Sequence, residues 1–258
     1  MSIEACGELV RRGDPDRFQT VLLAPPNLRG RLMVLYAFNL ELARVAWVSR
    51  EPLIAQMRLQ FWLDVLNEVE KGVQPRAHEV AQPLAVLITT CNLLPEPLRQ
   101  MVVARRFEIE RQPFRRVEEL LKYGKEGAAN LIWMAAKALG ASENSYAVAM
   151  EFGTGVGVAG VLQANSKFVE RGFNPLEGLE KSEISGLAKD ALLKISASRL
   201  KRREFPTFCS AAFLAGWQAD LILKKVVANP ECVFDGSLQF SEFTKRSRLM
   251  LRGVFNTW

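Results

Sequence analysis

The sequence predicts an all-α protein with a single domain, and three observations support this. Apolar residues recur every three or four positions in long blocks, which is the helical period, rather than at every second position. Prolines stand at the junctions between these blocks. The one Asp-Gly turn, at residues 235–236, is not followed by an alternating segment, and no linker or internal repeat divides residues 1–258. We therefore expect helices over residues 28–48, 53–71, 84–92, 97–111, 117–139, 144–169, 181–203, 207–228 and 241–255.

The first two blocks show the helical period in detail. The first places Leu32, Leu35, Tyr36, Leu42 and Val45 on one face, and the second does the same with Leu59, Trp62, Val65, Leu66 and Val69. Pro52 separates them, and proline's fixed φ suits the first turn of a helix. The later blocks follow the same rule, because prolines at positions 97, 113, 175, 206 and 230 stand at or before their starts.

A glycine run at residues 153–160 has two interpretations. It superficially resembles a dinucleotide-binding loop, but such a loop follows a strand, and the preceding residues have a helical pattern. Glycine within a helix costs about 1 kcal/mol relative to alanine. We therefore expect these glycines to allow close packing between helices or to leave room for a ligand.

Composition and charge narrow the function classes. The chain has 258 residues, of which 49% are hydrophobic, with a net charge of +6 and a pI near 9.3. This excess suits a membrane surface, a diphosphate or a nucleic acid. No nucleic-acid-binding motif is present and the basic residues are spread along the chain, so no nucleic-acid partner is expected.

The four cysteines include no C-x-x-C pair and His78 is the one histidine, so zinc and iron–sulfur sites lack ligands. The amino terminus has no signal-peptide pattern. The longest charge-free stretches, residues 80–95, 152–166 and 205–219, are shorter than the roughly 18 residues of a membrane span. We expect a cytoplasmic protein, with contact at the inner membrane being peripheral.

Three segments resemble the squalene/phytoene synthase family. The first is Asp16-Arg-Phe18 with Leu22-Leu-Ala-Pro25, Arg29 and Leu35-Tyr-Ala-Phe38. The second is Glu51-Pro52 with Arg58-Leu-Gln-Phe-Trp62, similar to the family's R-L-x-x-W segment. The third is the glycine-rich helix that leads into Arg171 and Pro175. The resemblance implies a single-domain isoprenoid synthase fold, with helices around a central apolar cavity.

The chemistry of that family requires Mg²⁺, because two prenyl diphosphates react with loss of pyrophosphate. The family supplies carboxylates in two D-x-x-x-D motifs on facing helices, and Mg²⁺ prefers such oxygen ligands. Here the first pair falls on Ala43 and Trp47, and counting back from Arg171 puts the second pair on Leu162 and Ser166. Residues 152–169 contain no Asp or Glu. We therefore predict a pseudoenzyme with no catalytic residues, no metal site and no cofactor.

The segment Ala37-Phe-Asn-Leu-Glu-Leu-Ala43 is similar to one branch of the family, which contains a mitochondrial complex I assembly factor and its α-proteobacterial relatives. This resemblance implies a role in the biogenesis of respiratory complex I at the membrane, with complex I subunits as partners and a prenyl or lipid chain as ligand. The alternative is an active prenyl diphosphate condensing transferase of the phytoene or squalene synthase type, which needs Mg²⁺.

Arg29, Tyr36, Arg58 and Trp62 match family positions at the rim of the cavity and are the candidate ligand-binding residues. Hydrogen bonding between helices and binding of an anionic head group remain open for the arginines, because the guanidinium serves both. Asp64 and Glu68 mimic a metal motif, but we interpret them as a solvated helix face.

The carboxy-terminal block, residues 241–255, combines an apolar stripe with a basic one. Basic amphipathic helices can lie in an anionic membrane interface. The simpler alternative is a last helix that packs its apolar stripe on the core.

Overall fold

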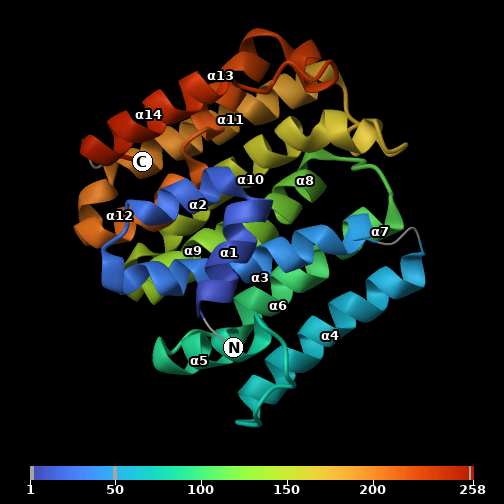
Figure 1. The fold of residues 1–258 in the computed structure, drawn as a ribbon. Helices are drawn as coiled ribbons and strands as arrows, with labels where there is room; N and C mark the ends of the chain where they lie inside the picture. The colour runs from blue at the N-terminus through green and yellow to red at the C-terminus, as the bar shows by residue number, and fades with distance from the viewer. Residues whose placement is uncertain (1–2, 49–50, 256) are drawn as a thin grey trace.

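The computed structural model describes residues 3–48, 51–255 and 257–258, and this part of the chain contains helices and no strands (Figure 1). The predicted fold class is therefore confirmed. The α-helices are α1 (Ile3–Gly13), α2 (Pro15–Leu22), α3 (Arg29–Val48), α4 (Pro52–Glu70), α5 (Ala81–Thr90), α6 (Pro95–Ala104), α7 (Arg106–Glu110), α8 (Val117–Gly124), α9 (Asn130–Ala138), α10 (Tyr146–Val169), α11 (Lys181–Leu200), α12 (Ser210–Phe213), α13 (Ala219–Ala228) and α14 (Glu242–Val254).

The two amino-terminal helices were not predicted from the sequence. α1 buries Cys6 and Val10, and Leu9 packs beside them on the core, so its amphipathic pattern was present in the sequence but was not recognised. α2 begins at Pro15, and the Asp14 side chain caps it by accepting a hydrogen bond from the Arg17 N–H at 3.0 Å. The expected helix over residues 207–228 is broken into 3₁₀ turns, α12 and α13.

The glycine run lies in the middle of α10, the long helix at the centre of the fold (Figure 1). A methyl group on Gly157 would stand 2.5 Å from the Cα atom of Gly124, at the end of α8. Gly153 is equally close to the backbone of Ala129, in the π-helical turn η2 (Lys125–Ala129) that joins α8 to α9. These contacts confirm close helix packing as the role of Gly153 and Gly157, whereas Gly160 has no neighbour within 4 Å of its virtual Cβ.

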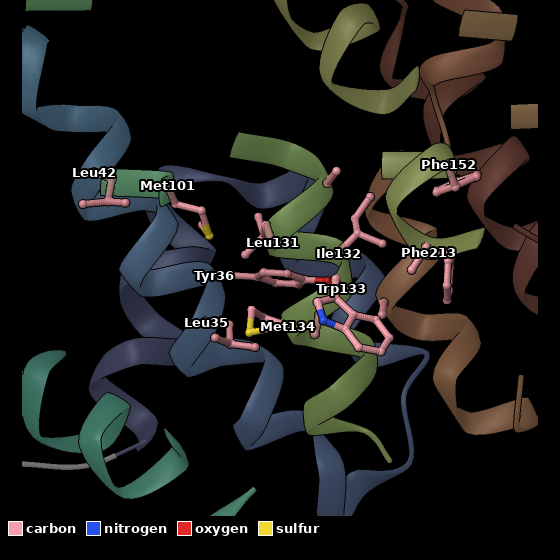
Figure 2. Close-up of a cluster of buried hydrophobic side chains, with 14 of the residues drawn as sticks. Leu35, Tyr36, Leu42, Met101, Leu131, Ile132, Trp133, Met134, Phe152 and Phe213 are labelled. Atoms are coloured by element: carbon pink, nitrogen blue, oxygen red, sulfur yellow. The ribbon is translucent and has the colours of Figure 1, made fainter. Parts of the chain in front are cut away.

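The buried side chains of the described residues form one hydrophobic cluster. Figure 2 shows its middle, where Tyr36 of α3 lies against Leu131, Ile132 and Met134 of α9. Trp258 closes the cluster near α12, with its ring stacked on Phe213 at a centroid distance of 4.2 Å.

One helix, with its preceding 3₁₀ turn (Glu143–Val169), is long and apolar enough to cross a membrane, counter to the expectation from charge-free stretches. Its most apolar window is 61% buried inside the fold, as expected for the central helix of a helical bundle.

Candidate functional site

A cavity of about 430 Å³ lies between α3 and α10, with α8, η2, α9 and α13 contributing to its wall. Each of the two long helices offers one face to it, since the lining residues recur four positions apart. On α3 these residues are Asn39, Ala43 and Trp47. On α10 they include Gly160, Ala164 and Phe168, together with Val156, Gly157, Ala159, Val161 and Gln163. Small residues therefore make much of this wall.

The first predicted motif pair, Ala43 and Trp47, lies on this wall. The second pair does not, because Leu162 is fully buried and Ser166 lies near Gly236. A shift of two residues along a helix turns a side chain by about 200°. Several pairs on α10 with this spacing line the cavity, and the pair Ala164 and Phe168 includes the ring that contacts Trp47, so we move the register on α10 by two positions.

Trp47 and Phe168 contact each other across the cavity, with ring centroids 5.0 Å apart. The Arg171 guanidinium covers the Trp47 ring, with its Cζ atom 3.8 Å from the ring centroid. Both rings and Glu108 also line a second, outer cleft of about 740 Å³ near Pro52 and Phe173. The aromatic pair thus forms the wall between the inner cavity and the outer cleft.

Glu108 is a carboxylate at this wall, and it is 5% exposed. Arg105 and the Tyr123 hydroxyl both donate to its Oε1 atom at 2.5 Å. Arg105 also donates to Asn39 Oδ1 at 3.3 Å, which links the group to α3. Burial raises the pKa of Tyr123, so this hydroxyl keeps its proton and remains a donor. The charge of the Glu108 carboxylate is therefore already balanced by Arg105, and Tyr123 adds a hydrogen bond.

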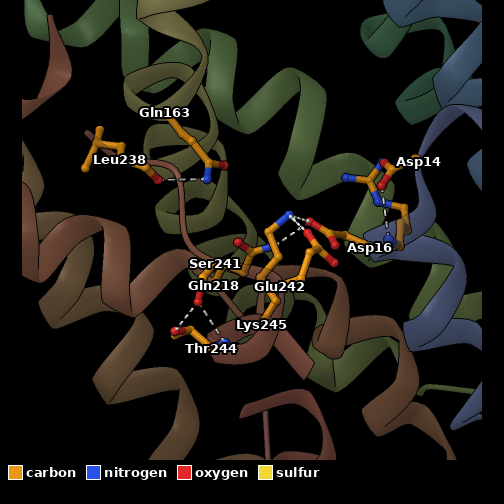
Figure 3. A network of polar contacts seen from close by, with 10 residues as sticks. Asp14, Asp16, Gln163, Gln218, Leu238, Ser241, Glu242, Thr244 and Lys245 are labelled. Carbon is orange, nitrogen blue, oxygen red and sulfur yellow. Dashed lines mark hydrogen bonds and ion pairs between the residues drawn. The ribbon is translucent and has the colours of Figure 1, made fainter. Parts of the chain in front are cut away.

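Polar residues of α2 and its amino-terminal cap stand at the other end of the cavity. Asp14 pairs with Arg17 at 3.4 Å, and Asp16 pairs with Lys245 at 2.9 Å. Gln218 donates to Asp16 at 3.0 Å (Figure 3). The cavity, which was expected to be apolar, therefore has polar and charged groups in its wall.

Three buried polar atoms near α2 have no hydrogen-bond partner within the described part of the chain: Arg17 Nε, the Tyr36 hydroxyl and Gln218 Oε1. The Arg17 Cζ atom lies 5.3 Å from the centroid of the Tyr36 ring. Burial raises the pKa of Tyr36, so its hydroxyl remains protonated. Unsatisfied buried groups are costly, and a polar ligand group or water that bonded them would be stabilised.

None of the four predicted rim residues is part of the cavity lining: Tyr36 is buried against Arg17, and the other three stand further away. Arg29 donates to the carbonyl oxygens of Leu22 and Ala24, at 2.7 and 2.9 Å, and so holds the loop before α3. Arg58 is exposed on α4, and Trp62 is buried edge-on against Phe38.

Asp64 and Glu68 of α4 pair with Arg76 on the surface, which fits the prediction of a solvated face.

Sequence reasoning missed Arg105, Glu108 and Gln218, because nothing in the local pattern marks them as inward-facing. Arg17 had a signal, since it stands in the Asp16-Arg-Phe18 segment that carried the resemblance.

Comparison with known proteins is consistent with this geometry. The sequence model of the squalene/phytoene synthase family matches residues 10–172. The chain is 25% identical to the bovine (Bos taurus) NADH dehydrogenase (ubiquinone) complex I assembly factor 6, over 98% of this chain and 81% of the relative. It is also 25% identical to the human protein of that name, over 91% of this chain and 76% of the relative.

Solved structures share the fold. A dehydrosqualene synthase crystallised with a ligand superposes with a TM-score of 0.80 at 15% identity, covering 98% of this chain and 95% of the other. A squalene synthase from Alicyclobacillus acidocaldarius gives a TM-score of 0.73 at 18% identity, covering 87% and 92%.

Proposed function

This chain belongs to the squalene/phytoene synthase family, and we propose that it acts in the assembly of respiratory complex I by binding rather than by catalysis. The relatives named complex I assembly factor 6 support the biological role, because they match nearly the whole chain. The protein then works as a pseudoenzyme, with complex I subunits as partners and without a cofactor.

The contact of Trp47 with Phe168 is the observation that supports a non-catalytic role. Loss of pyrophosphate from a prenyl diphosphate requires cations that neutralise the leaving group, and Mg²⁺ requires oxygen ligands. At the motif positions that line this cavity stand Ala43, Trp47, Ala164 and Phe168, none of which offers a carboxylate. Arg171 over the Trp47 ring adds a positive charge, which disfavours a second cation there.

A prenyl or lipid chain is the ligand that suits the cavity. The small residues of α10 and η2 leave room for an extended apolar chain between α3 and α10. Arg17 and Gln218 line the cavity, and each has a buried atom without a partner, which suits a polar head group at the α2 end. The chain is then held without being ionised. Such a protein works at the inner face of the membrane in which complex I is built, as a cytoplasmic protein with peripheral contact.

The alternative is an active Mg²⁺-dependent synthase, which the shared fold favours. Three carboxylates, Asp14, Asp16 and Glu108, do line the cavity. Each is paired with a basic side chain, so none is available to a metal unless an ion pair breaks.

Pyrophosphate release separates the two functions. Purified protein is incubated with farnesyl and geranylgeranyl diphosphate, with Mg²⁺ and with chelator, and the same samples are scored for binding by thermal shift. We expect no pyrophosphate and a rise in Tm with prenyl compounds that does not need Mg²⁺. Release that chelator abolishes would establish the synthase instead.

The role in assembly needs a test in cells. Deletion of the gene in its source organism should lower NADH:quinone oxidoreductase activity and the amount of assembled complex I on native gels. Complementation with the chain should restore both, and normal complex I in the deletion strain would refute the role.

A further inference from the structure

The last helix, α14, turns its apolar side chains to the solvent. Phe243 is 82% exposed and Val254 is 71% exposed, with Met250, Leu251 and Phe255 also exposed. Leu249 is its one buried residue. An amphipathic helix of a soluble protein normally buries its apolar stripe against the core. Packing on the core, one of the two alternatives that the sequence left open, therefore does not hold for these five side chains.

Ion pairs hold α14 in this orientation. Lys245 pairs with Asp16 of α2 at 2.9 Å, beside Glu242 at 3.0 Å (Figure 3). Arg252 donates to the buried Asp220 of α13 at 3.0 Å, and Arg248 lies 3.8 Å from the same carboxylate. The polar face of the helix thus faces the protein and leaves the apolar face without a partner among the described residues.

The exposed apolar surface continues onto the segment after α2. A methyl group on Gly253 would stand 3.0 Å from Leu23, so α14 and this segment touch. Leu22 and Leu23 are both exposed. We call the combined surface the α14 patch, formed by Leu22, Leu23, Phe243, Met250, Leu251, Val254 and Phe255.

Basic residues flank the α14 patch. Arg199 and Arg252, both paired with the buried Asp220, are largely buried themselves and bring the end of α11 beside α14. Exposed Arg246 stands on α14 itself, between Phe243 and Met250. Residues 201–203, Lys-Arg-Arg, are exposed directly after Arg199 and follow Leu200, which is itself exposed. The combination of protruding apolar side chains and excess basic charge is complementary to an anionic lipid surface.

We propose that the α14 patch docks the protein on an anionic bilayer, with the apolar side chains inserted below the head groups and the surrounding basic side chains near the lipid phosphates. The proposal gives a surface to the membrane contact within the proposed function. It depends on neither the cavity nor complex I, so a test with lipid alone can fail without affecting those parts.

Vesicle co-sedimentation of the full chain tests the proposal. The vesicles are phosphatidylcholine alone, or phosphatidylcholine mixed equally with phosphatidylglycerol. We expect binding to the anionic vesicles that is at least about tenfold stronger than to neutral ones and weakens with salt, since exposed charges are screened. Comparable binding to both, or no binding to either, would overturn the proposal.

Matched variants assign the binding to α14. Phe243→Ser with Val254→Ser should lower the partition coefficient at least about tenfold, because two large apolar groups no longer insert. The control, Val86→Ser with Leu193→Ser, changes comparably exposed apolar residues on α5 and α11 and should bind as the parent does. Thermal melts check that both variants fold.

Gel filtration of the same samples identifies a competing occupant. A parent dimer that the Phe243→Ser, Val254→Ser variant dissolves, together with absent vesicle binding, would assign the α14 patch to a second copy of the chain and refute membrane docking.

Discussion

Two glycines of α10 line the cavity, and replacing each with alanine should change the stability of the protein in opposite directions. A Cβ atom on Gly157 would lie 2.5 Å from the Cα and 2.7 Å from the carbonyl oxygen of Gly124. Real contacts of this kind are about 1 Å longer, and backbone atoms cannot rotate away as a side chain can. Gly157→Ala therefore forces α8 and α10 apart, and overpacking of this kind costs about 1–3 kcal/mol. Gly160, three residues later, has no neighbour within 4 Å of its virtual Cβ.

Gly160→Ala should stabilise the protein by about 0.5–1 kcal/mol, because alanine is the better helix former. Urea unfolding monitored by circular dichroism measures both changes. In thermal melts the Tm values of the two variants should differ by roughly 3–16 °C, given about 2–4 °C per kcal/mol for a chain of this size. Equal stabilities, or a more stable Gly157→Ala, would show that α8 and α10 are not packed as closely as described.

Three further predictions concern charge, thiols and the motif register. The three arginines around Asp220 outweigh its burial, which alone would raise its pKa, and hold that pKa below the ordinary value. The stability from this carboxylate is therefore present at neutral pH and is lost as the pH falls below about 4 towards the depressed pKa. Asp220→Asn should lower the free energy of unfolding in urea by about 3 kcal/mol at pH 7. It should also weaken the loss of stability at acid pH. An unchanged dependence of stability on pH would contradict the ion-pair cluster. Burial raises the pKa of Cys6 and of Cys209 to about 11. A thiol reagent should therefore label the half-exposed Cys91 first in the native protein, as followed by mass spectrometry. Equally fast labelling of Cys6 or Cys209 would refute their burial. Asp substitutions at the four cavity-lining positions, Ala43, Trp47, Ala164 and Phe168, should create a rise in Tm that depends on Mg²⁺. A control variant that carries its second Asp pair at positions 162 and 166 should show no such rise. The reverse result would restore the register that was predicted from the sequence.

The sequence predicted the parts of the fold that depend on local pattern. Pro52 and the apolar period located α3 and α4 to within a few residues, and the glycine run predicted the close packing of α10. α1 was missed although its pattern is amphipathic, with Cys6, Leu9 and Val10 turned to the core. The polar end of the cavity could not be predicted, because the contact of Asp16 with Lys245 joins opposite ends of the chain. Nothing local distinguishes either residue from an ordinary surface charge.

The position of the second motif on α10 was predicted two residues too early, for a related reason. Counting back from Arg171 assumes that the turn after α10 has the length usual in the family, and periodicity within an apolar helix cannot correct this. Nearly every position of α10 is apolar or small, so the sequence marks no single face. The facing helix resolves the ambiguity, because the contact of Trp47 with Phe168 identifies the side of α10 that meets α3.

That contact also supports the proposed absence of a metal site, in addition to the lack of a carboxylate at these four positions. Two carboxylates at these positions would repel each other and would need a cation between them, whereas Trp47 and Phe168 attract each other at a centroid distance of 5.0 Å. Arg171 is then stabilised over the Trp47 ring at 3.8 Å, in a cation–π contact. A single Asp at position 47 would meet the Arg171 guanidinium first and form an ion pair, leaving no free ligand for Mg²⁺. The aromatic pair and the arginine therefore form a self-consistent packing arrangement, and no single substitution leads from it to a metal site.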